Sequence, residues 1–371
     1  YFQIAPCFRD EDARADRSPG EFYQLDFEMS FATQEDVFRV GEEVLTATFE
    51  KFAPEGSVVT AAPYPVISYK QAMLEFGSDK PDLRNPLRIV DVTDFFQRCT
   101  FKPFHGQTVR AIKVSNKMSK GFHEKLLKFA TSIGMGGLGY LEVKEDLSYK
   151  GPIDKFIPDD MKAEIREIAS LKAGDTIFFI ADKEKQAALY AGQLRNELGQ
   201  RLDLLEKNAY RFCFINDFPM YEYDEEQKKI IFTHNPFSMP QGGLEALTTK
   251  DPLELLAYQY DIVCNGVELS SGAVRNHNLD IMVKAFEIAG YTEEDLKEKF
   301  GALYNAFQYG APPHAGMAPG VDRMIMLLRN EENIREVIPF PMNGNAQDVM
   351  CGAPNEVSEM QLREVHIKVR K

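Results

Sequence analysis

The sequence predicts a fold of the α+β class, because stretches with the period of a strand and stretches with the period of a helix both occur along its 371 residues. Residues 22–29 alternate apolar and polar side chains, which is typical of a half-buried strand. Residues 34–52 repeat apolar side chains at helical spacing. Residues from about 100 to 210 combine short apolar runs with long helical patterns, which indicates a second, self-contained α+β region inserted into the first.

These patterns divide the chain into three blocks, at 1–100, 101–210 and 211–371. In the first block, a short helix expected over 68–76 ends in the polar, proline-containing loop 77–86. In the second block we expect strands at 109–114, 139–143 and 176–180 and helices at 120–133, 155–171 and 183–205. In the third block we expect strands at 212–215 and 230–234 and helices at 278–289, 292–309 and 321–328.

Hydrophobic residues make up 44% of the chain, which is enough to bury a substantial core in two domains, or in one domain with an insertion. No apolar run approaches the length of about 18 residues that a membrane span needs, so none is expected. The net charge of −14 argues against a general binder of polyanions. A local basic surface can still bind RNA, with modest and salt-sensitive affinity.

The five cysteines are odd in number, are scattered along the chain and form no CxxC pair. They support neither a zinc ribbon nor a disulfide framework, and a reducing, cytoplasmic compartment fits them best. The chain begins with Tyr1 rather than Met, and no signal peptide is visible there. Residues 1–8 have the pattern of a strand that is already under way, so we expect the natural protein to extend upstream.

The segment from Gly134 to Gly139 satisfies the pattern GxGxxG, which occurs in dinucleotide-binding sites. Such a site needs a strand before the glycines and a helix after them. In this chain the predicted helix comes first and the predicted strand follows. We therefore expect a flexible turn from helix to strand, and no dinucleotide site.

A dense run of charges of both signs at residues 9–17 precedes the predicted strand at 22–29. Such a run cannot pack in a core, so we expect a hairpin made of a strand, a charged loop and a second strand. A solvated surface loop is the simpler interpretation. The same hairpin would also suit a bound nucleotide, because arginine neutralises phosphate through two parallel hydrogen bonds and an aromatic ring offers the base a face to stack on.

Asp261 and Glu268 flank an Asn265-Gly266 dipeptide, which is typical of a tight hairpin turn. Two carboxylates across a hairpin can converge on a hard cation such as Mg²⁺, although this spacing alone is weak support for a metal site. No Ser/His/Asp or Cys/His arrangement for nucleophilic catalysis is visible in the sequence.

Two separate motifs point to a known family. Residues 8–26, FRDEDARADRSPGEFYQLD, closely resemble motif 2 of bacterial aspartyl-tRNA synthetases, which are class II aminoacyl-tRNA synthetases. Residues 316–328, GMAPGVDRMIMLL, are similar to motif 3 of the same family. The loop 77–86 and the block 101–210 also resemble family segments, and the latter resembles the GAD-like domain that bacterial members insert between motifs 2 and 3.

The resemblance implies an antiparallel sheet flanked by helices, an inserted α+β domain and a C-terminal extension. It covers essentially all of the chain, whereas motif 1 and the N-terminal anticodon-binding domain of the family have no counterpart in it. Three positions depart from the family pattern. Asn235 stands where a second histidine is common, Pro319 where an aromatic or aliphatic residue is common, and Gly20 lengthens the motif 2 loop by one residue.

The resemblance also implies an activity, the ATP-dependent activation of aspartate and its transfer to tRNA. Arg9 and Arg323 are the implied catalytic residues. Arg9 would contact the α-phosphate and the amino-acid carboxylate, while Phe22 and Arg323 would stack on the two faces of adenine. The implied ATP-binding set is Arg9, Asp10, Glu11, Phe22, Glu268, Gly320, Val321, Asp322 and Arg323.

The implied metal ligands are Asp261 and Glu268, which would hold Mg²⁺ on the ATP phosphates. Arg275 would bind the side-chain carboxylate of aspartate, because a fixed guanidinium suits that group best. The implied aspartate-binding set is Arg9, Gln24, Asp26, His234 and Arg275.

The implied partners are tRNA(Asp), with tRNA(Asn) as a further candidate, L-aspartate, and a second copy of the chain in a homodimer; no membrane partner is expected. Three alternatives stay open. The first is a sister enzyme that charges asparagine or lysine, against which Arg275 and His234 favour an acidic substrate. The second is a non-catalytic paralogue that binds RNA or a partner protein. The third is a paralogue that activates aspartate for an acceptor other than tRNA.

Overall fold

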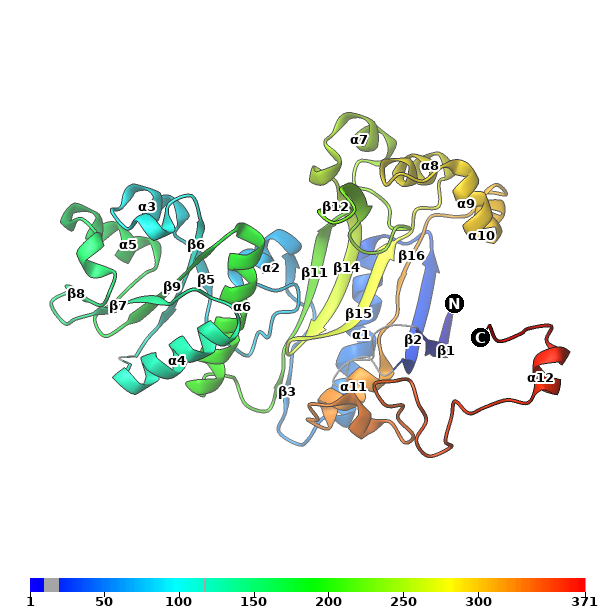
Figure 1. Cartoon of the computed structure of the whole chain (residues 1–371), viewed down its shortest axis with the longest axis horizontal. Coiled ribbons are helices and arrows are strands. Elements are labelled where there is room, and N and C mark those ends of the chain that lie inside the picture. Colours follow the sequence, from blue (N-terminus) through cyan, green and yellow to red (C-terminus); the bar gives the residue numbers. More distant parts are fainter. Residues whose placement is uncertain (10–19, 117, 371) are drawn as a thin grey trace. The chain divides into compact units, whose positions relative to one another are not determined.

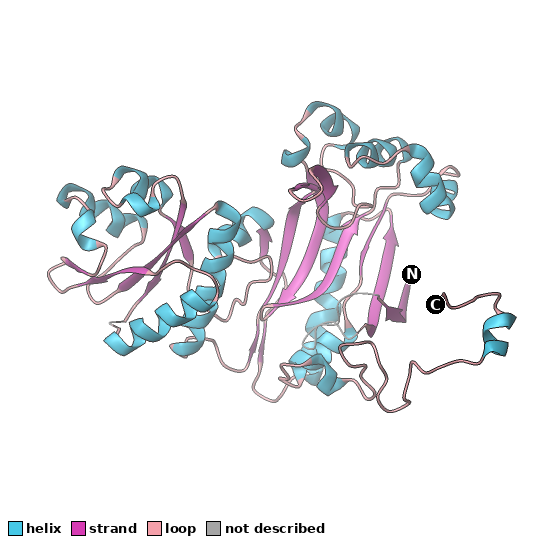
Figure 2. Ribbon diagram, in the orientation of Figure 1, coloured by secondary structure: helices cyan, strands magenta, loops and turns pink. Residues whose placement is uncertain are grey.

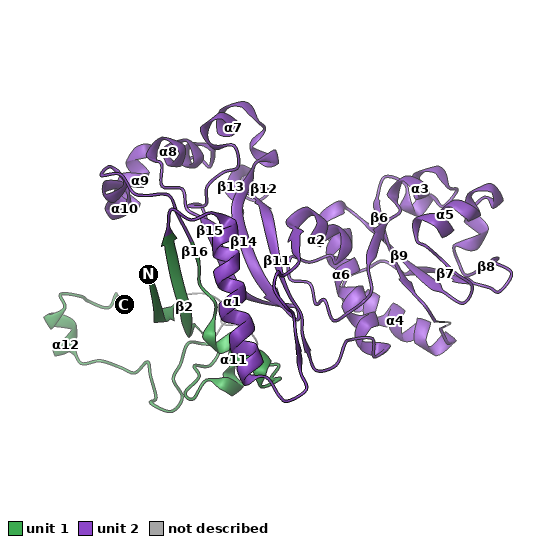
Figure 3. Ribbon diagram, turned by 180° about the vertical axis from the view of Figure 1, so that it is seen from behind, with its two compact units in different colours: residues 1–29, 316–371 green, residues 30–315 purple. Residues whose placement is uncertain are grey.

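The computed structural model describes residues 1–9, 20–116 and 118–370, which form two compact units (Figure 3). Unit 1 comprises residues 1–29 and 316–371, and unit 2 comprises residues 30–315. The chain therefore leaves unit 1 early and returns to it near its C-terminal end. Among the described residues, no helix is long and apolar enough to cross a membrane.

Unit 1 begins with the hairpin that the sequence predicts. Strands β1 (Phe2–Phe8) and β2 (Glu21–Ser30) pair antiparallel. Successive side chains of a strand point to opposite faces, so Phe22, Gln24 and Asp26 share one face of β2. The tip of the hairpin, residues 10–19, lies outside the described part of the chain.

The second segment of unit 1 begins at Gly316, within β16 (His314–Met317). Helix α11 (Val321–Leu328) has the predicted bounds, and the chain continues through the 3₁₀ turn η5 (Ile334–Val337) to the short helix α12 (Glu359–Glu364). Gly316 lies against β2, because a Cβ atom built on it would approach the carbonyl oxygen of Phe27 to 2.1 Å. Only glycine fits at this position.

Replacing Gly316 with alanine should therefore destabilise the fold, by about 2 kcal/mol, because the backbone of β2 would have to move. The midpoint of chemical unfolding of the full protein measures this effect. Gly301→Ala is the matched control, since a Cβ atom there would meet no atom of the described chain within 4 Å. Equal unfolding midpoints for the two variants would contradict the close approach to β2.

The main sheet of unit 2 has the strand order β15-β14-β11-β4. Its strands are β4 (Val66–Ser68), β11 (Phe212–Pro219), β14 (Leu256–Cys264) and β15 (Val267–Val274). The pairs β11–β14 and β14–β15 are antiparallel, as expected, and the short edge strand β4 pairs with β11 in parallel.

Helix α1 (Gln34–Phe52) covers this sheet and has the predicted bounds. It begins with a capping box, in which Thr33 and Asp36 each bond to the other's backbone N–H. The ring of Phe38 stacks on Phe214 of β11 with 3.7 Å between the centroids. Local capping and tertiary packing therefore support the same helix.

The other elements around the main sheet are short. The segment predicted as one helix over 292–309 forms two, α9 and α10, which are separated at Phe300. The backbone of Phe300 is not helical, with φ −128° and ψ 30°, and its half-buried ring packs edge-on against Phe237. The bounds are β3 (Val58–Val59), α2 (Tyr69–Glu75), β10 (Ala209–Tyr210), β12 (Tyr221–Asp224), β13 (Lys229–Phe232), α7 (Gly243–Thr249), η4 (Pro252–Glu254), α8 (Leu279–Ile288), α9 (Glu293–Lys299) and α10 (Gly301–Phe307).

A second, five-stranded antiparallel sheet in unit 2 has the order β5-β6-β9-β7-β8 (Figures 1 and 2). Its elements are β5 (Ile89–Asp91), α3 (Thr93–Arg98), η1 (Lys102–Phe104), β6 (Thr108–Val114), α4 (Lys120–Ser132), β7 (Gly139–Val143), β8 (Tyr149–Lys150), η2 (Asp154–Phe156), η3 (Asp159–Met161), α5 (Lys162–Ile168), β9 (Thr176–Asp182) and α6 (Glu184–Arg201). The first strand of this sheet, β5, lies before residue 101, where the sequence analysis places the start of the second block. The domain boundaries themselves stay a prediction.

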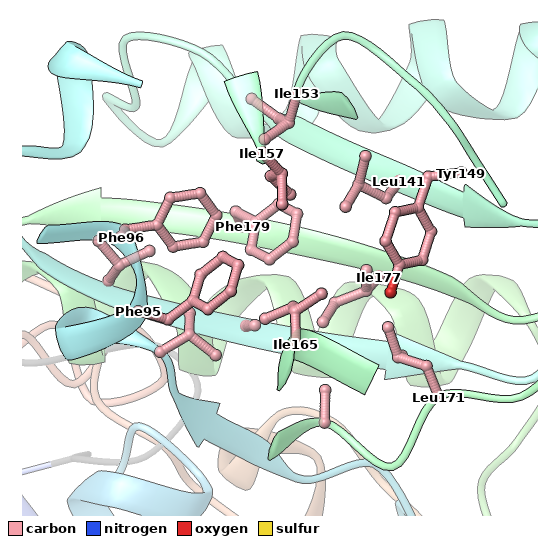
Figure 4. Packing of buried hydrophobic residues seen from close by; sticks show 14 of the residues in the cluster. Phe95, Phe96, Leu141, Tyr149, Ile153, Ile157, Ile165, Leu171, Ile177 and Phe179 are labelled. Carbon is pink, nitrogen blue, oxygen red and sulfur yellow. The ribbon is translucent and has the colours of Figure 1, made fainter. Parts of the chain in front are cut away.

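Both faces of this sheet are buried. Phe179 of β9 packs with α3 and α5 in the cluster drawn in Figure 4. Its neighbour Phe178 points to the other face, where α4 and α6 pack. Successive side chains of β9 therefore point into two different hydrophobic clusters, as expected for a sheet covered by helices on each side.

Two local expectations in this region had different outcomes. The single helix predicted over 155–171 is wrong, because Pro158 interrupts it and leaves two 3₁₀ turns and the short helix α5. The expected turn at the GxGxxG segment is confirmed. Helix α4 precedes it, β7 follows it, and Gly134 adopts a φ of 99°, which favours glycine.

Candidate active site

The motif 2 and motif 3 segments meet in unit 1. The backbone N–H of Tyr23 donates to the Asp322 carboxylate at 2.7 Å, although the two residues are 299 positions apart. The N–H of Leu25 donates to the carbonyl of Pro319 at 2.8 Å, and Gln24 forms an isolated bridge with Gly320. These bonds fix the turn before α11 against β2, so both motifs present their side chains from one supported framework.

Arg9 and Phe22 lie together at the loop end of the β1–β2 hairpin. The guanidinium carbon of Arg9 is 5.1 Å from the centre of the Phe22 ring, which is within the range of a cation–π contact. The Arg9 N–H donates to the carbonyl of Gly20 at 2.9 Å, which closes the base of the charged loop. Asp10 and Glu11, both predicted to bind ATP, lie outside the described residues.

Gln24 and Asp26 project from the same face of β2 as Phe22. The Asp26 carboxylate accepts a hydrogen bond from Gln3 at 2.9 Å, and the Gln24 side chain donates to the carbonyl of Ala318 at 3.3 Å. Gly320 is the N-cap residue of α11 and makes no side-chain cap bond, and Val321, Asp322 and Arg323 form the first turn. The first N–H groups of a helix have no partner within the helix and favour an anion.

In unit 2, Asp261 and Glu268 occupy one face of the β14–β15 hairpin. The turn residues Asn265 and Gly266 both have positive φ, at 53° and 82°, as the sequence signal predicts. Glu268 lies opposite Val263, which is two positions from Asp261 along β14. Because side chains two positions apart share a face, the two carboxylates lie on the same side of the hairpin.

Asp261 is a buried carboxylate with an unsatisfied atom. Its residue is 4% exposed, and its Oδ1 has no hydrogen-bond partner among the residues that the structure describes. Burial, and then the neighbouring Glu268 carboxylate, raise the pKa of Asp261 well above its usual value, while Lys80 acts in the opposite direction. A cation at Oδ1 would remove both unfavourable effects.

Lys80 supplies a positive charge at this place. Its ammonium lies 3.2 Å from the Glu268 carboxylate and 2.9 Å from Asp79. Burial lowers the pKa of Lys80, but Glu268 and Asp79 outweigh this effect, so the pKa is raised overall. The site prediction missed Asp79 and Lys80, although it identified their loop, 77–86, as a family segment.

His234 and Arg275 are joined through the backbone of the loop that follows β13. Ser238 forms an isolated bridge with Arg275, and the N–H of Met239 donates to the carbonyl of Val274 at 2.8 Å. Partial desolvation lowers the pKa of His234, Asp79 and Glu268 counteract this shift, and Lys80 reinforces it. His234 therefore lies within electrostatic reach of Asp79, Lys80 and Glu268.

The predicted site residues therefore fall into two groups. Unit 1 carries Arg9, Phe22, Gln24, Asp26 and the residues 320–323, and unit 2 carries His234, Asp261, Glu268 and Arg275. No group of three or more His, Cys, Asp or Glu side chains within the described ranges could hold a metal ion. Two carboxylates still suit Mg²⁺, which is usually bound by one or two carboxylates together with substrate phosphates and water.

Comparisons with known proteins identify the family. The family model described as tRNA synthetases class II (D, K and N) matches residues 1–344. The Aspartate--tRNA(Asp/Asn) ligase of Zymomonas mobilis is 58% identical over 100% of this chain and 63% of its own length. The Aspartate--tRNA ligase of Streptomyces avermitilis is 55% identical over 100% of this chain and 63% of its own length.

Among solved structures, the aspartyl tRNA synthetase from Entamoeba histolytica matches with a TM-score of 0.43 and 16% identity, over 92% of this chain and 47% of that chain. The chain thus spans about 63% of the length of the two curated relatives above. The sequence match over residues 1–344 shows that this chain belongs to the class II tRNA synthetases of the D, K and N group.

Proposed function

We propose that the protein containing this chain activates L-aspartate with ATP and transfers the aspartyl group to the 3′ end of tRNA(Asp). The observation that carries the proposal is the charge arrangement of unit 2, in which the buried Asp261 and the half-buried Glu268 share one side of a hairpin and Lys80 lies 3.2 Å from Glu268. This arrangement suits an ATP-bound cation beside a substrate that carries its own negative charges.

The first chemical step would be an in-line displacement. A carboxylate oxygen of aspartate attacks the α-phosphorus of ATP, the P–O bond to the β-phosphate breaks, and pyrophosphate leaves. Two anions approach each other in this step, so a positive group must lie between them. Arg9 is the candidate, because the residue is exposed and its guanidinium rests on the Phe22 ring.

Asp261 and Glu268 would hold Mg²⁺, and the unpartnered Oδ1 of Asp261 is the feature of the described residues that fits this ion best. The bound ion would neutralise negative charge on the phosphates. Gly320 to Arg323 would bind ATP at the start of α11, where backbone N–H groups favour anions. In the second step a ribose hydroxyl of tRNA attacks the carbonyl carbon of aspartyl-adenylate, and AMP leaves.

Substrate choice would rest on Arg275 and His234, with Gln24 and Asp26 near the amino-acid backbone. A guanidinium prefers a carboxylate over the neutral amide of asparagine or the ammonium of lysine. We further infer that the protein works as a cytoplasmic homodimer and that residues 101–210 are a GAD-like insertion. The five cysteines are free, which is typical of a reducing compartment.

Aspartate-dependent exchange of pyrophosphate into ATP tests the proposal, with asparagine and lysine as controls and with the full natural chain as enzyme. We expect exchange with aspartate alone. Charging of tRNA(Asp) and tRNA(Asn) then defines the acceptor, since the names of the relatives include ligases for tRNA(Asp/Asn). A folded protein that exchanges with no amino acid would instead support a non-catalytic paralogue.

A further inference from the structure

Arg195 of helix α6 is a buried cation. Its residue is 1% exposed, and its guanidinium donates to backbone carbonyls, to Leu87 at 2.8 Å, to Asp82 at 3.0 Å and to Asn85 at 2.8 Å. Burial, and then the charge of Arg88, lower the pKa of Arg195 to about 10, so it stays charged at neutral pH. A buried charge is costly unless its donors are satisfied, which suggests a specific reason for its presence.

The three carbonyls belong to one segment, residues 77–87, which we call the linking loop. It connects α2 to β5, the first strand of the five-stranded sheet. The Asn85 side chain donates in return to the carbonyl of Arg195 at 2.9 Å. Arg195 and the linking loop are thus joined by hydrogen bonds in both directions.

The linking loop also fits closely against α6 through glycines. A Cβ atom on Gly77 would lie 2.2 Å from the carbonyl oxygen of Ala188, and one on Gly192 would lie 2.6 Å from the carbonyl oxygen of Gly77. A Cβ atom on Gly199 would lie 2.3 Å from the Asn85 side chain. Helix α6 therefore holds both ends of the loop, and α6 itself packs on the five-stranded sheet (Figure 1).

Between these two fixed ends, the linking loop reaches the carboxylate pair of the β14–β15 hairpin. The Lys80 ammonium lies 3.2 Å from Glu268, and its side chain is 31% exposed. A Cβ atom on Gly266, in the turn of that hairpin, would lie 3.4 Å from the Cβ of Asp82. The loop thus contacts α6 and the candidate cation site at once.

We propose that Lys80 is a further residue of the ATP site, where its ammonium binds phosphate oxygens beside the cation, and that Arg195 is a positioning residue that presents Lys80 through the linking loop. This inference rests on the proposed function for the identity of the ligand. Lysine acts as a compact point charge on a flexible stem, so its position depends on the backbone that carries it. The Lys80 ammonium is partly open to solvent, so it can turn to phosphate oxygens when a divalent cation takes over the carboxylate of Glu268.

Binding of an ATP analogue tests the proposal without any amino acid. The probe is Mg²⁺ with an analogue that has a methylene bridge between the α- and β-phosphates, titrated calorimetrically into the full natural chain. Lys80→Met should weaken binding by about tenfold or more, as expected for the loss of a charged contact to phosphate. Arg195→Lys should weaken it by about fivefold, because a lysine cannot donate to three carbonyls in a fixed fork.

The double variant distinguishes positioning from general destabilisation. If Arg195 acts through Lys80, adding Arg195→Lys to Lys80→Met should weaken binding no further. Lys70→Met and Arg201→Met are the controls, since Lys70 is exposed on α2 and Arg201 lies on α6 with Glu197 as its partner. Thermal unfolding of each variant accompanies the titrations. Asn85→Ser, which removes the return bond to Arg195, replaces Arg195→Lys if that variant does not fold.

Unchanged or tighter binding by Lys80→Met would overturn the role of Lys80 and leave it a counter-ion of Glu268. Fully additive losses in the double variant would overturn the role of Arg195. Wild-type protein that binds the analogue but exchanges with no amino acid would contradict the proposed aspartate activation and leave this inference standing. Wild-type protein that does not bind the analogue would overturn both.

Discussion

Replacing Arg9 with alanine should nearly abolish aspartate-dependent pyrophosphate exchange, with a loss of about 1,000-fold or more. The physical reason is that this side chain is the candidate to lie between the aspartate carboxylate and the α-phosphate. Its guanidinium is supported by the Phe22 ring at 5.1 Å, so its donors need little reorganisation when the charges meet. The loss should appear in kcat as well as in KM, because the interaction strengthens as the new bond forms.

Two further variants sharpen this prediction. Arg9→Lys keeps the charge but lacks the planar fork that two anions can share, so it should recover only part of the activity. Arg39→Ala is the control, since Arg39 is an exposed arginine on α1 that pairs with Asp36. If Arg9→Ala retains exchange within a few-fold of the wild type, the assigned role of Arg9 is excluded. Arg323 would then be the next candidate for the cation between the two anions.

Elements with strong local signals could be predicted from the sequence. Helix α1 follows a capping box at Thr33, β7 is bounded by a glycine turn, and the hairpin of β14 and β15 turns at Asn265-Gly266, where both residues need positive φ. In each case the residues that define the element lie within a few positions of one another, so a single sequence carries the whole signal.

Features that depend on distant residues could not be predicted in the same way. The parallel pairing of β4 with β11 joins residues 66–68 to residues 214–216, and the inclusion of β5 in the second sheet depends on β6. The helix expected over 155–171 is a different case. Its Pro158 was a visible local signal of interruption that the periodic pattern outweighed in the prediction.

The same distinction applies to the candidate site. Asp261 and Glu268 were predicted as cation ligands from the family resemblance, since their spacing across a hairpin is weak support by itself. The motif residues were predicted from the same resemblance, which supplied the long-range information. Lys80 was missed because its contact with Glu268 spans much of the chain. Arg195 was missed because a charged residue in a helical pattern ordinarily faces water, and only the folded linking loop shows which carbonyls it binds.

Replacing Asp261 with asparagine should reduce exchange by about 100-fold and raise the Mg²⁺ concentration needed for half-maximal rate. Asparagine has nearly the same shape but no charge, so the change removes one carboxylate ligand with little effect on packing. Stability should stay the same or increase, because the folded protein would no longer bury a carboxylate beside Glu268.

This opposition between activity and stability separates a functional carboxylate from a structural one. Asp175→Asn is the matched control, since Asp175 is similarly buried, at 5% exposed, but accepts a hydrogen bond from the N–H of Lys172 in the five-stranded region. That variant should lose stability and keep the Mg²⁺ dependence of the wild type. If Asp261→Asn instead loses stability and keeps its Mg²⁺ dependence, Asp261 supports the fold and is not a cation ligand.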